Sequence, residues 1–151
     1  MATPIWSVNN NMKKLPTIDI KGKQYVMVKD RIIAFNELYP SGSIETEIVK
    51  NDENSVVVKA TIKVDDEKSG RAIRIFNGHS EAYRNGGQMG QVPVEVAETS
   101  AVGRALAMLG IGIIESVASA DEIVKSQPKN NKVKYNYEAD SDLQALSELD
   151  Q

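Results

Sequence analysis

The sequence is poor in the residues that most metal sites and many catalytic sites need. Its 151 residues include no cysteine, one histidine and eight aromatic side chains. Without cysteine, disulfides, thiolate nucleophiles and thiolate zinc sites are excluded together. The chain has no run of eighteen apolar residues and no basic-then-apolar start, so it predicts neither a membrane span nor a secretion signal. We therefore expect a soluble, cytoplasmic protein with no metal or other cofactor.

The composition suits one folded domain with polar ends. Hydrophobic residues make up 41% of the chain and charged residues 26%, which is enough for one core. We expect a flexible arm over residues 1–16, a domain over residues 17–126, and a disordered linker and acidic tail over residues 127–151. Residues 138–151 hold five acids and no Lys or Arg. The net charge of −3 therefore divides into +2 for residues 1–137 and −5 for the tail.

Residues 92–110 predict the central helix of the domain. Pro93 suits a first helical turn, and Gly110 is a typical left-handed helix end. The helical spacing predicts a buried stripe made of Ala97, Ala101, Val102, Ala105, Leu106, Met108 and Leu109. A second face has only small residues and would let another backbone approach, either from the chain's own sheet or from a second subunit. These residues are Thr99, Gly103, Ala107 and Gly110.

Alternating residues upstream of this helix predict an antiparallel sheet. A hairpin is expected over 17–28, then a short helix that ends before Pro40. Strands are expected over 43–50, around Val56 to Val64 and over 71–84, with the residues at alternate positions from Val56 to Val64 buried. We therefore expect an α+β fold, in which a curved antiparallel sheet or a small OB-like barrel is packed by the central helix.

Local signals add three smaller expectations. The interrupted alternation at Gly78 predicts a bulge or bend in its strand. The glycine-rich stretch 85–91 predicts a mobile loop. Ser119 with Glu122 predicts a capping box that opens a further short helix.

An enzyme of this sequence would have to use His79 with Glu81 or Ser80. Residues two apart on a strand share a face, so a hydrogen-bonded structural pair of His79 with Glu81 is the favoured explanation of the pattern. The sequence has no nucleophile elbow, phosphate loop or second metal-ligating histidine. We therefore expect no enzymatic activity.

Basic residues on adjoining strands favour a nucleic-acid-binding surface instead. Lys and Arg neutralise phosphates and aromatic side chains stack on bases, which together bind single strands. Ordinary solvation of a sheet face is the alternative explanation. The predicted DNA-binding residues are Lys21, Lys23, Lys59, Lys63, Arg71, Arg74, Phe76, Tyr83 and Arg84.

Four stretches resemble a family of phage single-stranded DNA-binding proteins. They are IDIKGKQYVMVKDRIIAFNELYPSGSIETEI (18–48), GHSEAY (78–83), AETSAVGRALAMLGIGI (97–113) and ASADEI (118–123). The likeness covers about residues 17–126, and the third stretch is the most specific. Phages of lactic-acid and related Gram-positive bacteria encode this family near recombination genes. The resemblance implies a variant OB-fold, a homodimer, and sequence-independent single-stranded DNA binding in phage DNA replication and recombination, in the host cell cytoplasm.

Two other functions stay open. The glycine-containing strand and the helix with its Arg-Ala-Leu and terminal glycine are also similar to the core of single-strand annealing proteins, which implies annealing in recombination. A pure protein-interaction module is the third possibility, because an acidic tail with a few apolar anchors is typical of a docking peptide. Such a tail would contact a replication or recombination protein, although it would also serve as a solubilising end. Its anchors are Leu143, Leu146 and Leu149.

Overall fold

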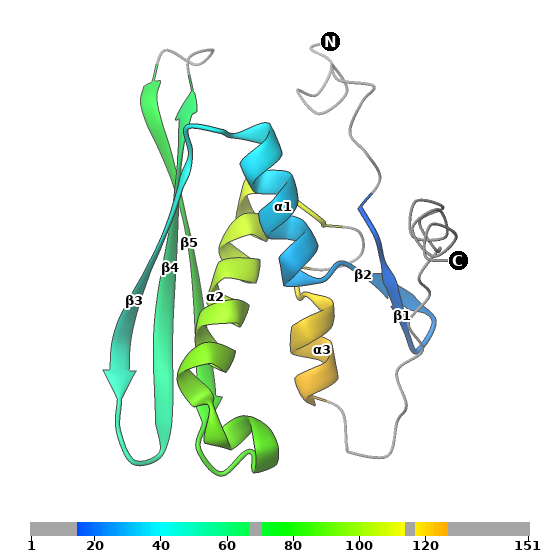
Figure 1. The fold of residues 1–151 in the computed structure, drawn as a ribbon, viewed down its shortest axis with the longest axis vertical. Helices are drawn as coiled ribbons and strands as arrows, with labels where there is room; N and C mark the ends of the chain where they lie inside the picture. The colour runs from blue at the N-terminus through cyan, green and yellow to red at the C-terminus, as the bar shows by residue number, and fades with distance from the viewer. Residues whose placement is uncertain (1–14, 67–70, 114–116, 127–151) are drawn as a thin grey trace, which may run out of the picture.

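The computed structural model describes residues 15–66, 71–113 and 117–126, which form an α+β fold (Figure 1). Two antiparallel sheets are present, of which the smaller has two strands and the larger three. The smaller sheet consists of β1 (Ile18–Ile20) and β2 (Lys23–Tyr25), and the larger of β3 (Ser43–Asn51), β4 (Ser55–Asp66) and β5 (Arg71–Tyr83). The α-helices lie on one side of the larger sheet (Figure 1). They are α1 (Val28–Leu38), α2 (Pro93–Leu109) and α3 (Ala120–Ser126).

The larger sheet is open, so the alternative of a small OB-like barrel is wrong for the described residues. Its strand order is β3-β4-β5, which leaves β3 and β5 as edges. Closure would need another strand to join these edges. The remaining strands, β1 and β2, instead pair with each other in a separate sheet beyond the helices (Figure 1). The α+β class and the antiparallel sheet are confirmed.

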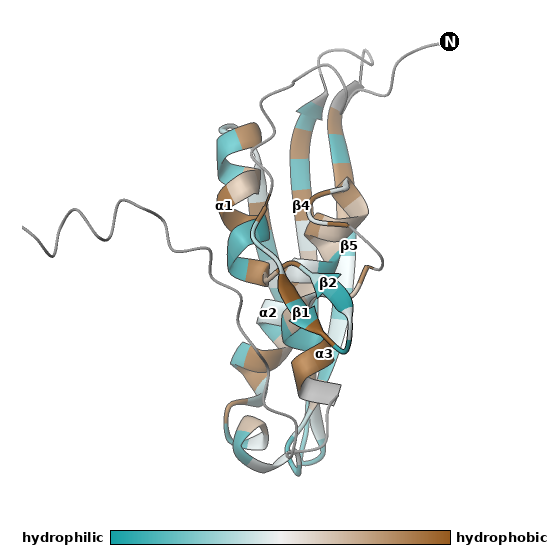
Figure 2. Cartoon of the chain, turned by 90° about the vertical axis from the view of Figure 1, so that its right-hand side faces the viewer, coloured by the Kyte–Doolittle hydropathy of each residue, from teal (hydrophilic) through white to brown (hydrophobic). Residues whose placement is uncertain are grey.

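The middle strand β4 supplies the sheet's contribution to the core. Val56, Val58, Ala60 and Ile62 are at most 1% exposed, as the alternation predicts. Hydrophilic and hydrophobic bands alternate along the strand (Figure 2). The polar residues between the buried ones therefore lie on the opposite face, which no helix covers.

Gly78 lies where β5 passes closest to α2, and the predicted bulge there is wrong. The pairing of β4 with β5 continues through it, with Ala60 opposite Gly78. A Cβ at this position would overlap the carbonyl oxygen of Ala101 and lie 2.5 Å from the nitrogen of Ala105. The glycine therefore lets the helix backbone rest directly on the strand. The irregularities of the sheet fall elsewhere, at Val49 and near the end of β4.

The central helix is confirmed, with Pro93 in its first turn and Gly110 at a φ of 104° as its left-handed end. The buried stripe is confirmed in part, because Met108 is 52% exposed. Of the two contacts predicted for the small-residue face, the one with the chain's own sheet is wrong at Gly103, and the one with a second subunit stays a prediction. A Cβ on Gly103 would lie 2.6 Å from Cγ2 of Val28, so this face accommodates α1.

A fully buried arginine joins α1 to the end of α2. The guanidinium of Arg31 donates hydrogen bonds to the carbonyl oxygens of Gly103 (2.8 Å), Val117 (3.1 Å), Gly112 (3.2 Å) and Ala118 (3.4 Å). Hydrogen bonds to carbonyl oxygens offset part of the cost of burying a charged guanidinium. Arg31 thus holds together segments that lie more than seventy residues apart in the chain.

The hairpin and the last helix form a second, small core. Ile18, Ile20 and Ala120 are buried there. The capping box is confirmed, since the backbone N–H of Ser119 donates to Glu122 over 2.9 Å. Asp121 accepts a hydrogen bond from the N–H of Val28 over 2.9 Å, so α3 caps the start of α1.

Some predictions differ from the structure or fall outside it. The stretch 85–91, predicted as a loop, contains the 3-10 helix η2 (Gly87–Gln91). The arm before Leu15, the linker, the acidic tail and its three leucines lie outside the described residues. No helix in the described part of the chain is long and apolar enough to cross a membrane.

Candidate nucleic-acid interface

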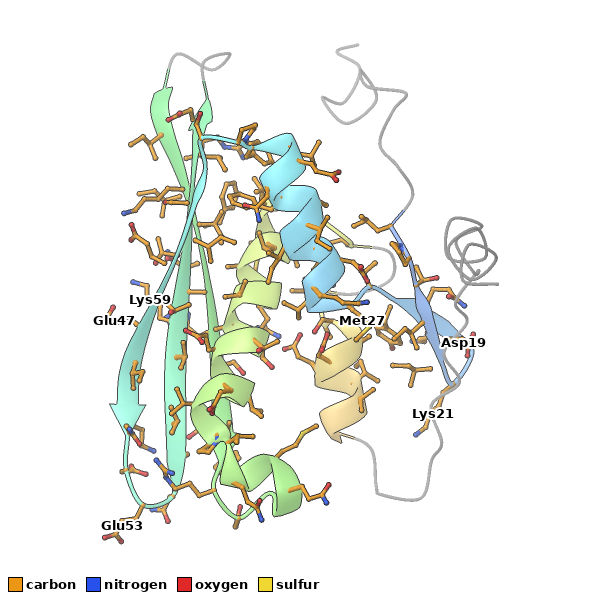
Figure 3. The ribbon with its side chains drawn as sticks, in the orientation of Figure 1. Asp19, Lys21, Met27, Glu47, Glu53 and Lys59 are labelled. Atoms are coloured by element: carbon orange, nitrogen blue, oxygen red, sulfur yellow. The ribbon has the colours of Figure 1, made fainter. Side chains whose placement is uncertain are left out.

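The predicted lysines of β4 lie on the face of the larger sheet that is turned away from the helices. We call this face the outer face. Lys59 and Lys63 alternate with the buried residues of β4, and Thr61 lies between them. Figure 3 shows Lys59 and Glu47 on the side of the sheet away from the helices. In the register, Lys59 is opposite Glu47 on β3 and His79 on β5.

The outer face is balanced in charge, not basic. Lys63 forms an ion pair with Glu45 at 2.9 Å, and Lys50 approaches Glu81 at 3.7 Å. Both pairs are substantially exposed and are therefore weak. Among the described side chains, none accepts a hydrogen bond from Lys59 and none forms an ion pair with it. Lys59 is thus the lysine of this face whose charge is least committed to the protein itself.

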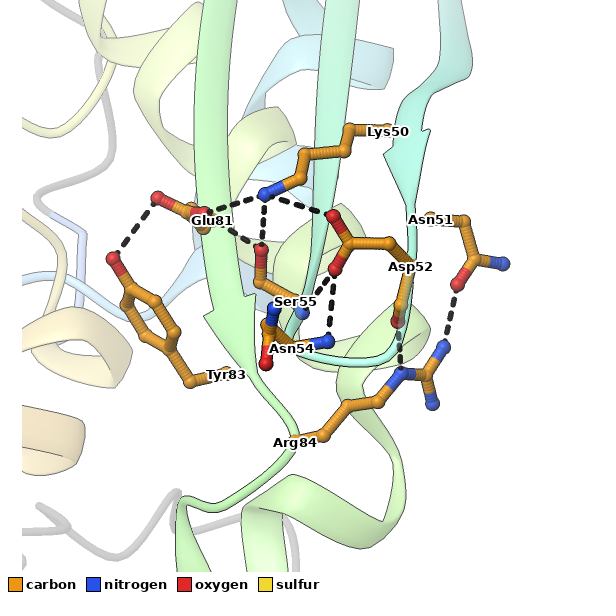
Figure 4. A network of polar contacts seen from close by, with 8 residues as sticks. All are labelled: Lys50, Asn51, Asp52, Asn54, Ser55, Glu81, Tyr83 and Arg84. Atoms are coloured by element: carbon orange, nitrogen blue, oxygen red, sulfur yellow. Dashed lines mark hydrogen bonds and ion pairs between the residues drawn. The ribbon is translucent and has the colours of Figure 1, made fainter.

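A polar network closes the end of this face at the turn between β3 and β4 (Figure 4). Asp52 accepts hydrogen bonds from the backbone N–H groups of Asn54 (2.8 Å) and Ser55 (2.9 Å), and Lys50 lies 3.2 Å away. The N–H groups of Ser55 and Asn54, followed by Lys50, lower the pKa of the Asp52 carboxyl to about 2.

The same network holds Glu81 as a carboxylate. The buried Ser55 hydroxyl donates to Glu81 over 2.7 Å and the Tyr83 hydroxyl over 3.1 Å. These hydrogen bonds, with the nearby Lys50, lower the pKa of the Glu81 carboxyl. The predicted pair of His79 with Glu81 shares the outer face, but the hydrogen-bond partners of Glu81 are Ser55 and Tyr83.

The predicted site residues do not form one surface. Tyr83 is 58% exposed on the outer face with Lys59 and Lys63. Placing Phe76 and Arg74 with them is wrong, because Phe76 pairs with buried Ile62 and packs against the core on the helix side. Arg74 stacks on it, with its guanidinium carbon 4.9 Å from the ring centre. The register of β5 is unbroken from Arg74 to Tyr83, so these residues fall on opposite faces.

The remaining predicted residues lie elsewhere. Lys21 and Lys23 belong to the small hairpin, and Figure 3 shows Lys21 across the molecule from Lys59. Arg84 donates to the carbonyl of Asp52 over 2.8 Å and to the side chain of Asn51, which closes the turn. Arg71 begins β5 opposite Asp66, and its side chain is not among those described.

Sequence reasoning missed the neighbours that β5 brings beside these lysines. Asn77 is opposite Thr61 and accepts its hydroxyl hydrogen bond at 3.0 Å, and His79 is opposite Lys59. Ile73 and Ile75 are more than half exposed and add apolar surface to this face. Alternation along β5 indicates which residues share a face, but only the register pairs them with β4. No group of three or more possible metal ligands occurs among the described residues.

Comparison with known families gives one match. Residues 32–109, just over half of the chain, match the family described as Slr1353 N-terminal dsRNA-binding domain-like. The chain belongs to this family. The matched residues run from α1 through the larger sheet to the last residue of α2. No curated protein and no solved structure matches the chain.

The family match supports the resemblance drawn from sequence only in its coarser part. Its description is that of a nucleic-acid-binding domain, which agrees with the predicted function class. The description names neither phages nor single-stranded DNA, so nothing in the match supports the phage family, the OB-fold or phage replication. The matched segment contains part of α1, the three strands of the larger sheet and α2. It therefore includes the whole outer face.

Proposed function

We propose that this protein binds single-stranded DNA without sequence preference through the outer face. The observation that carries the proposal is an uncovered sheet face with Lys59 and Lys63 in its middle strand and His79 and Asn77 beside them. Lysines there contact phosphates, while Thr61, Asn77 and His79 offer hydrogen-bonding groups between them. Membership of a nucleic-acid-binding type of family supports the same function class.

Stacking contributes little to this binding. Tyr83 is the described aromatic side chain that is exposed on this face, since Phe76 packs on the helix side. A base stacked on an aromatic side chain is worth about 1–3 kcal/mol by alanine substitution. The affinity therefore rests on a small number of phosphate contacts and at most one such stack.

Double-stranded RNA is the second candidate, because the family's description names it. Domains that recognise duplex RNA span about 16 bp and contact several sugar-phosphate segments at once. Here the turn after β3 carries Asp52 and Glu53, and the first turns of α2 carry Glu95 and Glu98. Carboxylates at several edges of the fold repel a second phosphate backbone. A single strand that follows β4 avoids these edge carboxylates and meets Glu47 and Glu45 only beside Lys59 and Lys63.

A salt titration with oligo-dT tests the proposal. With Lys59 and Lys63 as the phosphate contacts, the slope of log K against log salt is expected to be about −1.4, from −0.7 for each contact. Lys59→Ala with Lys63→Ala should weaken binding and bring the slope towards zero. Lys21→Ala with Lys23→Ala is the matched control and should leave both unchanged, because these lysines lie on the far hairpin.

Other outcomes assign the function differently. Tighter binding of duplex RNA than of oligo-dT would select the second candidate. Accelerated pairing of complementary strands, beyond binding, would identify an annealing protein. If the control variant weakened binding as much as the outer-face variant, the proposed interface would be wrong.

A further inference from the structure

An apolar groove lies on the helix side, away from the outer face. Its volume is about 280 Å³, and it lies between the start of α2, the 3-10 helix η2, strand β1 and helix α3. Figure 2 shows the hydrophobic parts of β1 and α3 next to each other in this region. The lining consists of Ile18, Met27, Met89, Val96, Ala120 and Val124, with Thr99, Glu95 and Asp121 as its polar members.

The groove needs an apolar cover more than a ligand. Sites for drug-sized ligands are about 300–1,000 Å³, so this one is near the lower limit and suits one large side chain. The core beside it is small, with Ile18, Ile20 and Ala120 as its buried residues. A two-stranded hairpin such as β1–β2 has marginal stability on its own. An additional apolar side chain would bury more of this cluster.

Residues 1–14 and residues 127–151 both join the described part of the chain close to the groove. Ile18 lines it four positions after residue 14, and Val124 lines it three positions before residue 127. A segment joined by so short a tether has an effective concentration on the order of millimolar. The arm has the reach as well, since an extended chain covers about 3.3 Å per residue and Trp6 is nine positions from Leu15.

Charge selects the N-terminal arm over the acidic tail. The charged groups of the groove are the carboxylates of Glu95 and Asp121. Residues 1–16 contain Lys13 and Lys14 and no acid, and residues 127–137 contain three lysines and no acid, whereas residues 138–151 contain five acids and no base. Of the two basic segments, the N-terminal arm carries the largest apolar side chain, Trp6, which suits a groove for one large side chain. We propose that the N-terminal arm of the same chain docks in this groove and inserts Trp6 between α2, α3 and β1. The acidic tail is repelled from the same place.

Trp6 reports on its own docking because it is the single tryptophan of the protein. In the full chain its emission should be blue-shifted and resistant to acrylamide, compared with the unfolded chain. Met89→Glu places a carboxylate in the groove and should shift the emission to the red and increase quenching. Met108→Glu is the matched control: Met108 is 52% exposed against 42% for Met89, lies outside the groove, and its substitution should leave the emission unchanged.

A second variant leaves the folded domain untouched. Lys13→Glu with Lys14→Glu should shift the Trp6 emission to the red in the same way, and the circular dichroism should stay unchanged. This variant keeps the proposal testable even if Met89→Glu fails to fold. Wild-type emission equal to that of the unfolded chain would overturn the proposal. Emission that depends on protein concentration would overturn it as well, because the arm of a second copy would then fill the groove.

Discussion

Arg31 has a large structural role that no pattern in the sequence indicates. A buried guanidinium bonded to four carbonyl oxygens ties α1 to the end of α2 and to the residues before α3. Arg31→Met should lower the free energy of unfolding by about 3 kcal/mol, because it leaves several buried carbonyls without donors. Urea denaturation measures this. Arg31→Lys restores the charge without the planar fork, so it should recover only part of the loss. A loss below about 1 kcal/mol for Arg31→Met would show that water replaces these bonds.

Asp52 ties the β3–β4 turn through a carboxylate whose pKa is lowered to about 2. A carboxyl with a lower pKa in the folded state stabilises the fold above its unfolded pKa of 3.8, and this contribution is lost as the pH falls towards 2. Asp52→Asn should therefore reduce the dependence of stability on pH between about pH 4 and pH 2. Thermal unfolding over that range measures it. Glu53→Gln is the control, because Glu53 is an exposed carboxylate in the same turn; an equal effect of both variants would contradict the role of Asp52.

At the scale of elements, the contact of α2 with β5 depends on a glycine. Gly78→Ala adds a Cβ that overlaps the backbone of α2, so strand and helix must separate, at a cost of about 1–3 kcal/mol or more. Gly22→Ala is the comparison, since it has no atoms within 4 Å of the added Cβ and a φ of 81° as its main cost, roughly 1–2 kcal/mol. Hydrogen exchange distinguishes them. Gly78→Ala should lower amide protection along α2 and β5, and a loss confined to the site of substitution would contradict this packing.

At the scale of the whole molecule, charge is distributed unevenly along the chain. Removing residues 138–151 changes the formal net charge from −3 to +2, because those residues hold five acids and no base. The truncated protein should bind single-stranded DNA more tightly at low salt and lose that advantage at high salt, where screening acts within about 3 Å at 1 M. Fluorescence anisotropy with a labelled oligo-dT measures both. Equal affinities at low salt would show that the tail neither competes with DNA nor repels it.

Two further expectations stay predictions. They are the homodimer, and the docking of the tail to a replication or recombination protein through Leu143, Leu146 and Leu149.

Local patterns were sufficient for the elements themselves. The 3.6-residue spacing, Pro93 and Gly110 bound α2 within one residue at either end, and strict alternation identified the buried residues of β4. These signals work because helix ends and strand faces are determined by residues close together in sequence. The capping box of Ser119 with Glu122 is predictable for the same reason.

Long-range register decided the candidate site. Alternation alone separates Phe76 from Tyr83, since seven positions along an unbroken strand reverse the face, and this signal was present in the sequence. The partners of Lys59 and Lys63 were not present in the sequence. Glu47 and His79 lie opposite Lys59, and Glu45 lies diagonally across from Lys63, only because of how the strands pair. The charge of the outer face therefore had to be read from the sheet.

The sequence by itself determined that this chain forms α2, the alternating strands and an α+β domain, because period and capping are local properties. Only the tertiary structure decided that the sheet stays open and that Gly78 and Gly103 let α2 approach β5 and α1. It also buried Arg31 among carbonyls from distant segments and left Lys59 in the middle of a charge-balanced face. Those outcomes depend on which surfaces meet, and contacts between residues far apart in the chain leave no periodic trace along it.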